Sequence, residues 1–294
     1  MFGKSNINKS SEKLSTETKL ISDISDTRHE EIIRYGRAEI FEEIDHYLEG
    51  DFRRAFMLVN HVPAILDDLI DANGDNARLA EAKQILSMSF NGNNIQTPES
   101  WSKHIGELGD ILATMNREGI SSAKQICDEV LGYWTIEEAN LNRRTQILNA
   151  EDLDELNSDI GRSVGMQFLH LLTPDLDEDS KKGVARAYGF AIKLADNLSD
   201  VAEDLDKGFI NISQEDIESF GINIKDWDQS NEQLYIDAML IRIKQQYTVS
   251  DVILDRVIET NPNAVRGLEL FKKVAHSWLK QVVEKYSDLV VEKF

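Results

Sequence analysis

Two groups of acidic residues in the sequence have a spacing that could hold a metal ion. They are Asp67, Asp68 and Asp71 in the stretch DDLID, and Asp196, Asp200, Glu203 and Asp204 in the stretch DNLSDVAED. Residues four apart lie on one face of a helix, so each group would present a row of carboxylates. Like charges in such a row cost a helix roughly 0.2–0.5 kcal/mol per pair. A bound cation would offset that cost, and Mg²⁺ prefers carboxylate oxygens.

Either group alone has a simpler interpretation, which is a solvated helix face. The chain has 53 acidic residues among 294, so chance placement gives roughly nine or ten acidic pairs at this spacing. The presence of both rows favours a metal-binding function. Facing each other across a helical bundle, they could hold Mg²⁺ ions that neutralise a leaving diphosphate, above an apolar pocket that shelters a carbocation.

The elements that would carry these rows are helices. The chain has only four prolines, and its long segments of 3.6-residue apolar period predict an all-α fold, a helical bundle around a central cavity. The predicted helices are 28–49, 52–72, 76–90, 99–117, 121–148, 151–172, 178–207, 229–246, 248–260 and 263–291. Pro63 falls inside the second of them and predicts a kink or a restart near His61.

Two of these helices show the pattern most clearly. In 178–207 the apolar residues form one buried stripe, and a polar row lies on the opposite side. The stripe is Val184, Ala187, Ala191, Leu194, Leu198, Val201 and Leu205, and the polar row is Lys193, Asp196, Asp200, Asp204 and Lys207, with Gly189. In 52–72 the stripe is Phe52, Ala55, Val59, Val62, Leu66 and Leu69, with Asp67 and Asp71 on its flank.

Composition limits the partners. A net charge of −21 argues against nucleic acid, because binding it needs clustered Lys and Arg. The single cysteine, Cys127, excludes an intramolecular disulfide.

The sequence shows neither a signal peptide nor a membrane span, which predicts a cytoplasmic protein. We expect a flexible tail over 1–26 and one domain over 27–294.

Three stretches of the sequence resemble the squalene and phytoene synthase family. ADNLSDVAEDLDKGFINISQEDIESFGI, residues 195–222, is similar to the second aspartate-rich motif of that family. RRAFMLVNHVPAILDDLID, residues 53–71, resembles the first motif. IGRSVGMQFLHLLTPDLDED, residues 160–179, resembles the glycine-containing helix before the second motif. The order and spacing agree over about residues 50–225.

The resemblance implies an all-α isoprenoid-synthase domain that binds Mg²⁺ and an allylic prenyl diphosphate, either farnesyl or geranylgeranyl diphosphate. It implies that Asp67, Asp71, Asp200 and Asp204 are catalytic, and that they bind the metal together with Glu203. The substrate-binding candidates are Arg37, Arg162, Lys193 and Asp196. An apolar product would allow peripheral association with a membrane.

This sequence departs from the family pattern at the expected cations. Ala64 and Ser199 stand where the family has an arginine before each aspartate motif, and RYGRAEIF replaces a serine-rich phosphate-binding segment. The replacement cations could come from Arg34, Arg37, Arg162, Lys193, Lys272 and Lys273. Arg162 is favoured, because Gly161 and Gly165 would leave room beside it.

The predicted reaction is the head-to-head condensation of two allylic prenyl diphosphates. One alternative is a single-substrate terpene synthase, which ionises one prenyl diphosphate and then cyclises it or quenches it with water. Another is a non-catalytic helical assembly factor of the same fold. The sequence predicts neither the substrate chain length, nor the product, nor NADPH use, nor the oligomeric state.

Overall fold

The computed structural model describes the backbone of residues 37–73, 76–93, 100–228 and 232–286, and their side chains except those of 63–73, 76, 100 and 101. The regular elements of these ranges are helices, which confirms the predicted all-α class. None of the helices described is long and apolar enough to cross a membrane. The predicted tail over 1–26 and Arg34 lie outside the described residues.

The helices follow one another along the chain with short connections. They are α3 (Arg37–Tyr47), α4 (Gly50–Asn73), α5 (Asn76–Phe90), α6 (Ser100–Arg117), α7 (Ser122–Asn142), α8 (Ala150–Leu172), α9 (Glu178–Ser199), α10 (Val201–Asp206), α11 (Gln214–Phe220), α12 (Gln233–Thr260), the 3₁₀ turn η1 (Pro262–Ala264) and α13 (Val265–Lys285).

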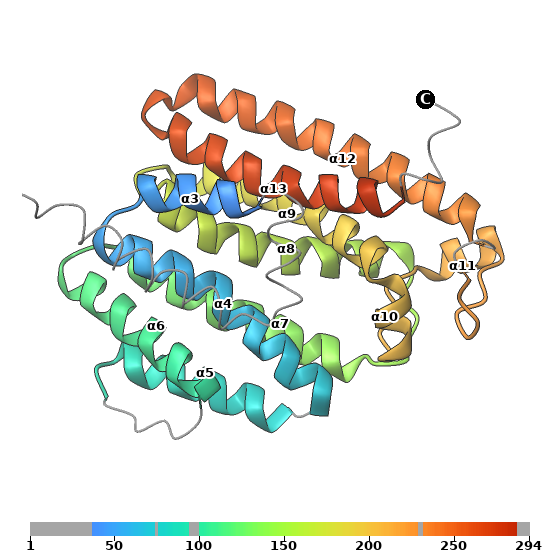
Figure 1. Ribbon diagram of the computed structural model, residues 1–294, viewed down its shortest axis with the longest axis horizontal. Helices are drawn as coiled ribbons and strands as arrows, with labels where there is room; N and C mark the ends of the chain where they lie inside the picture. The colour runs from blue at the N-terminus through green and yellow to red at the C-terminus, as the bar shows by residue number, and fades with distance from the viewer. Residues whose placement is uncertain (1–36, 74–75, 94–99, 229–231, 287–294) are drawn as a thin grey trace, which may run out of the picture.

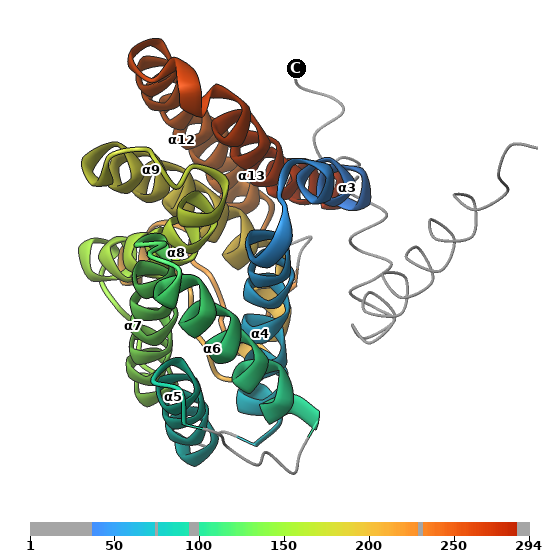
Figure 2. The ribbon, with the colours of Figure 1, turned by 90° about the vertical axis from the view of Figure 1, so that its left-hand side faces the viewer.

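The long helices are arranged around a central pair, α8 and α9. Figure 1 and Figure 2 show α12 and α13 on one side of this pair and α5 and α6 on the far side, with α4 and α7 between. The short helix α3 lies beside α13, and α9 also packs against α12 and α13. The pair α8 and α9 therefore forms the middle of the molecule.

Side-chain caps explain where several helices begin. Asn149 accepts a hydrogen bond from the backbone N–H of Asp152 at 2.8 Å, and Asp177 accepts one from Ser180 at 2.9 Å. Such caps satisfy an N–H group that has no partner inside the helix. These two caps fix the starts of α8 and α9.

Two glycines allow α8 and α9 to touch backbone to backbone. A Cβ atom added to Gly161 would lie 2.1 Å from the carbonyl oxygen of Gly189, and one added to Gly189 would lie 2.2 Å from the carbonyl carbon of Gly161. No side chain fits at such distances. Gly161 therefore serves helix packing and does not open space for a ligand beside Arg162.

The predicted apolar stripes lie in the core. Of the stripe on α9 and α10, six residues are buried and Leu205 is half-buried. On α4, Ala55, Val59 and Val62 are buried, while the side chains of Leu66 and Leu69 lie outside the described residues.

Several predicted boundaries are wrong. Helix 178–207 is divided at Asp200 into α9 and α10, whereas the predicted pair 229–246 and 248–260 is one helix, α12, over its described length. The helix predicted over 121–148 ends at Asn142, and the short helix α11 was not predicted. The helix α4 runs through Pro63 without restarting.

The α7–α8 connection is hydrogen-bonded to the segment that follows α10. The backbone N–H of Thr145 donates to the carbonyl of Gly208 at 2.8 Å, and the N–H of Gln214 donates to the carbonyl of Leu148 at 2.9 Å. Thr145 has a φ of 67°, a conformation that is uncommon for a β-branched residue. The backbone contacts hold this strained residue in place.

Candidate active site

The second acidic row keeps its alignment across the break between α9 and α10. The N–H of Asp200 donates to the carbonyl of Asp196 at 2.9 Å, and the N–H of Asp204 donates to the carbonyl of Asp200 at 2.8 Å. These bonds continue the helical pattern, so the three aspartates stay on one face. All three are half-buried.

A lysine ammonium lies within this row. The Nζ atom of Lys193 donates to Oδ2 of Asp196 at 2.7 Å, and the two side chains are 22% and 27% exposed. Burial raises the pKa of Glu137 on α7, although the charge of Lys193 acts in the opposite direction. Lys193 therefore interacts with carboxylates from both α9 and α7.

Asp204 is held by a chain of polar contacts. Oδ2 of Asp204 accepts a hydrogen bond from Nδ2 of Asn211 at 2.7 Å. The guanidinium of Arg143 donates to the side-chain oxygen of Asn211 and to the carbonyl of Ile210 at 3.1 Å. Burial lowers the pKa of Arg143, against the charges of Glu137 and Asp204. Arg143 thus anchors the segment that orients Asp204.

The pKa of the Asp200 carboxyl group is shifted upward. Burial and the charges of Asp196 and Asp204 raise the pKa of Asp200 to about 7, against the effect of the Lys285 ammonium. Lys285 comes from α13 and donates to the carbonyl oxygen of Ser199. It brings a cation next to Ser199, a position where the resemblance described above leads one to expect an arginine.

The other acidic candidate of this motif faces outward. The Glu203 side chain is 66% exposed, and its Oε1 atom lies 2.6 Å from Nζ of Lys207. The role predicted for Glu203 as a metal ligand would require a different orientation of this side chain.

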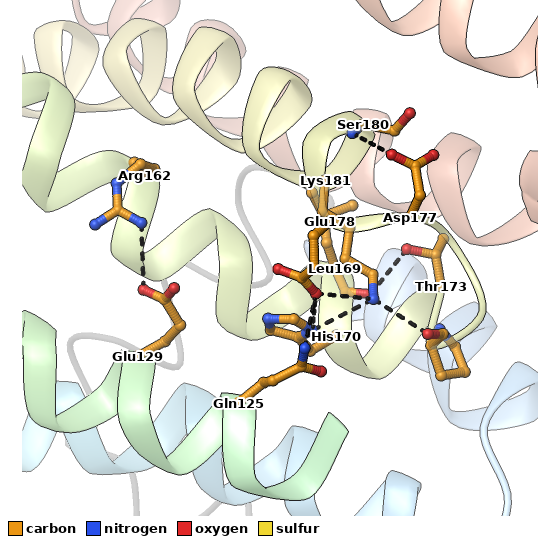
Figure 3. A network of polar contacts seen from close by, with 11 residues as sticks. Gln125, Glu129, Arg162, Leu169, His170, Thr173, Asp177, Glu178, Ser180 and Lys181 are labelled. Carbon is orange, nitrogen blue, oxygen red and sulfur yellow. Dashed lines mark hydrogen bonds and ion pairs between the residues drawn. The ribbon is translucent and has the colours of Figure 1, made fainter. Parts of the chain in front are cut away.

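Two predicted substrate-binding arginines contact protein groups. Arg37 is buried at the α3–α13 contact, where it donates to Ser277 and Gln281 and lies 4.0 Å from the ring centroid of Trp278. Figure 3 shows Arg162 of α8 directed at Glu129 of α7, with 3.5 Å between Nη1 and Oε2. Their predicted contact with a substrate stays a prediction.

The remaining basic candidates, Lys272 and Lys273, lie on α13. Nζ of Lys272 is 3.2 Å from Asp251 of α12, and Nζ of Lys273 is 2.6 Å from Glu43 of α3. Both lysines are partly exposed, and both form ion pairs between helices.

The first acidic motif lies on the C-terminal part of α4. This helix packs against α6 and α8. In Figure 1 it runs toward the lower right of the view, where α10 also lies. The side chains of Asp67, Asp68 and Asp71 lie outside the described residues. Their contact with the second motif stays a prediction.

The chemistry of the second motif fits a divalent cation. Among the described side chains, no three acidic, histidine or cysteine residues converge into a metal site. The donors are nevertheless carboxylates, the ligands that Mg²⁺ prefers. Burial, and then the charges of Asp196 and Asp204, raise the pKa of Asp200. Of the residues predicted to hold the ion, Asp200 and Asp204 are half-buried among the described side chains.

Sequence reasoning missed four residues of this site. They are Glu137, Arg143, Asn211 and Lys285. Glu137, Arg143 and Lys285 come from other segments and follow no spacing that would mark them. Asn211 carried a weak signal, since it follows the Lys207–Gly208 step within the second motif.

Comparison with known proteins supports the architecture. No protein-family model matches the sequence, and no curated protein does. A crystal structure of a dehydrosqualene synthase in complex with ligand is similar to this structure, with a TM-score of 0.56 at 17% identity. The match covers 94% of this chain and 99% of that chain. The protein therefore has the helical fold of an isoprenoid synthase.

Proposed function

We propose that the protein is a Mg²⁺-dependent prenyltransferase that condenses two allylic prenyl diphosphates head to head and releases diphosphate. The observation that carries this proposal is the acidic row of α9 and α10 within a fold similar to that of a dehydrosqualene synthase. The row is half-buried, it contains more carboxylates than the Lys193 ammonium alone can neutralise, and its first part lies on α9, one of the two central helices.

Each group would have a distinct task. Bound Mg²⁺ would neutralise the charge that develops on the leaving diphosphate. Asp67, Asp71, Asp200 and Asp204 would hold the metal, and Asn211 would orient Asp204. Lys193 and Lys285 would add fixed positive charge near the diphosphate oxygens.

A specific observation favours the single-substrate alternative. Arg37 and Arg162 donate to protein groups, and Ser199 offers no charge of its own. Each lost charge-assisted contact to a diphosphate is worth about 1.5–3 kcal/mol. A site with fewer cations would bind one diphosphate well and a second poorly, as in a terpene synthase.

Incubation with farnesyl or geranylgeranyl diphosphate and Mg²⁺, followed by product analysis, separates the two reactions. Condensation predicts products with twice the carbon number of the substrate and rates that depend on a second substrate molecule. The terpene synthase predicts products of unchanged carbon number and one saturable phase. Absence of diphosphate release with either substrate would contradict both and favour a non-catalytic assembly factor.

The metal role of the row can be tested with a matched pair of variants. Asp204→Asn keeps the size of the side chain but removes its charge, so we expect diphosphate release to fall by at least about 100-fold, the scale of one lost transition-state contact. Asp206→Asn, at an exposed position two residues further on, should retain wild-type release. Equal rates for the two variants would contradict the proposal.

A further inference from the structure

Lys193 on α9 is surrounded by carboxylates of the candidate site. Its ammonium donates to Asp196 at 2.7 Å, and its side chain is only 22% exposed. The position lies one turn before Asp196 and about two turns before Asp200 on the same face of α9. The lysine therefore belongs to the acidic row itself.

The electrostatics of the lysine agree with this geometry. Burial lowers the pKa of the Lys193 ammonium, but three carboxylates outweigh the effect and raise it overall: Asp196, Asp204 and Glu137. Lys193 therefore keeps its charge at neutral pH. It is a fixed cation that compensates groups on α7, α9 and α10.

The other lysines near the motif are placed differently. Lys207 pairs with the exposed Glu203, and Lys285 donates to a backbone carbonyl. Lys193 donates directly to a carboxylate of the row, from which a metal would take its ligands. A nearby ammonium would repel a Mg²⁺ ion bound by these oxygens.

We propose that Lys193 is a built-in counter-ion of the second acidic motif, which holds the carboxylates in place without metal and weakens their affinity for Mg²⁺. Diphosphate brings negative charge that offsets the ammonium, so the site takes up Mg²⁺ mainly together with diphosphate. The inference rests on the proposed function, because it takes Mg²⁺ and diphosphate as the ligands of this site.

Titration calorimetry with Mg²⁺ alone, and with Mg²⁺ plus inorganic diphosphate, tests the proposal on the full chain. Removing the charge in Lys193→Gln should tighten the binding of Mg²⁺ alone by about tenfold or more, since the repulsion is lost. It should also shrink the enhancement of Mg²⁺ binding by diphosphate. Lys193→Arg keeps the charge and should bind Mg²⁺ within about twofold of the wild type.

Lys124→Gln is the matched control. Lys124 also forms an ion pair with an aspartate on its own helix, Asp128, but at an exposed site near the other end of α7. This variant should leave Mg²⁺ affinity unchanged. If Lys193→Gln does not fold, Lys193→Met removes the same charge and keeps the apolar part of the side chain for packing.

Equal Mg²⁺ affinity in the wild type and the folded charge-removing variant, including no binding by either, would overturn the proposal. Tighter binding by Lys193→Arg would overturn it too, because the effect would not come from charge. The proposed function is tested by a different measurement: the absence of diphosphate release from prenyl substrates by the wild type would contradict it.

Discussion

At the scale of single residues, Asp200 should make metal binding depend on protons. A carboxyl group with a pKa of about 7 is half protonated at neutral pH, and a metal ligand must be deprotonated. Mg²⁺ binding at pH 7 should therefore release about half a proton from this group. Calorimetry in two buffers of different ionisation enthalpy measures the release. Heats that do not depend on the buffer at pH 7 would contradict the assignment.

His170 should make the stability of the fold depend on pH. It is 1% exposed, and burial together with the nearby Lys181 charge lowers its pKa to about 4. Figure 3 shows the two side chains together with Glu178 and Gln125. In the unfolded chain the pKa is about 6.5, so the unfolded state binds more protons between pH 6.5 and 4.

The free energy of unfolding should therefore fall as the pH drops from 6.5 to 4, by up to about 3 kcal/mol from this residue. Urea unfolding of the wild type and of His170→Gln at pH 7 and pH 4.5 measures the difference. The decrease in the free energy of unfolding between pH 7 and pH 4.5 should be smaller in His170→Gln than in the wild type. His46→Gln, at an exposed position of α3, should show the same decrease as the wild type. An equal decrease of this free energy in all three proteins would argue against a neutral buried histidine.

The structure also shows how much of the site the sequence could predict. The row of Asp196, Asp200 and Asp204 was predictable, because helical spacing alone places it on one face. The sequence also implied unrelieved repulsion within this row. In the structure Lys193 and Asn211 offset that repulsion, and Asn211 reaches Asp204 only through the fold of the segment after α10. Partners from α7 and α13 carry no local spacing signal.

At the scale of elements, the crossing of α8 and α9 should tolerate no side chain. The Cβ of Gly161→Ala would meet the backbone of Gly189 at 2.1 Å, which forces the helices apart. We expect a loss of about 1–3 kcal/mol or more, the usual range for overpacking. Denaturant unfolding measures it.

Gly183→Ala on α9 is the control for this prediction. Nothing lies within 4 Å of a Cβ added there, so the better helix propensity of alanine should stabilise the protein by up to about 1 kcal/mol. A destabilisation of equal size in both variants would contradict the prediction that the α8–α9 contact at Gly161 cannot accommodate a side chain.

Helix existence was predicted better than helix ends, for physical reasons. Apolar periodicity reports which face is buried, and it persists across Asp200, where the hydrogen bonds continue although the backbone leaves helical geometry. The division into α9 and α10 therefore has no counterpart in the apolar pattern. Likewise, α12 was predicted as two helices, although its buried positions Ile243, Tyr247, Ser250 and Leu254 keep the helical spacing. A buried serine and the exposed Val249 and Val252 obscure that spacing in the sequence.

At the scale of the whole molecule, ligands should stabilise the fold. Mg²⁺ and inorganic diphosphate at about 100 times their dissociation constant should add about 2.7 kcal/mol. Thermal unfolding with and without both ligands measures the effect. Asp204→Ala should lose it, while Asp206→Ala should keep it. Identical melting curves with and without ligands in the wild type would contradict a metal site in this fold.

The hydrogen bonds between the α7–α8 connection and the segment after α10 also couple their motions. The N–H of Thr145 is bonded to Gly208 and that of Gln214 to Leu148, so we expect a shift of α10 to move the connection with it. If ligands draw α10 inward, the amide protons of Thr145 and Gln214 should become protected against deuterium exchange together, and to the same degree. The two segments would then open and close as one cooperative unit, although 69 positions separate these two amides in the chain.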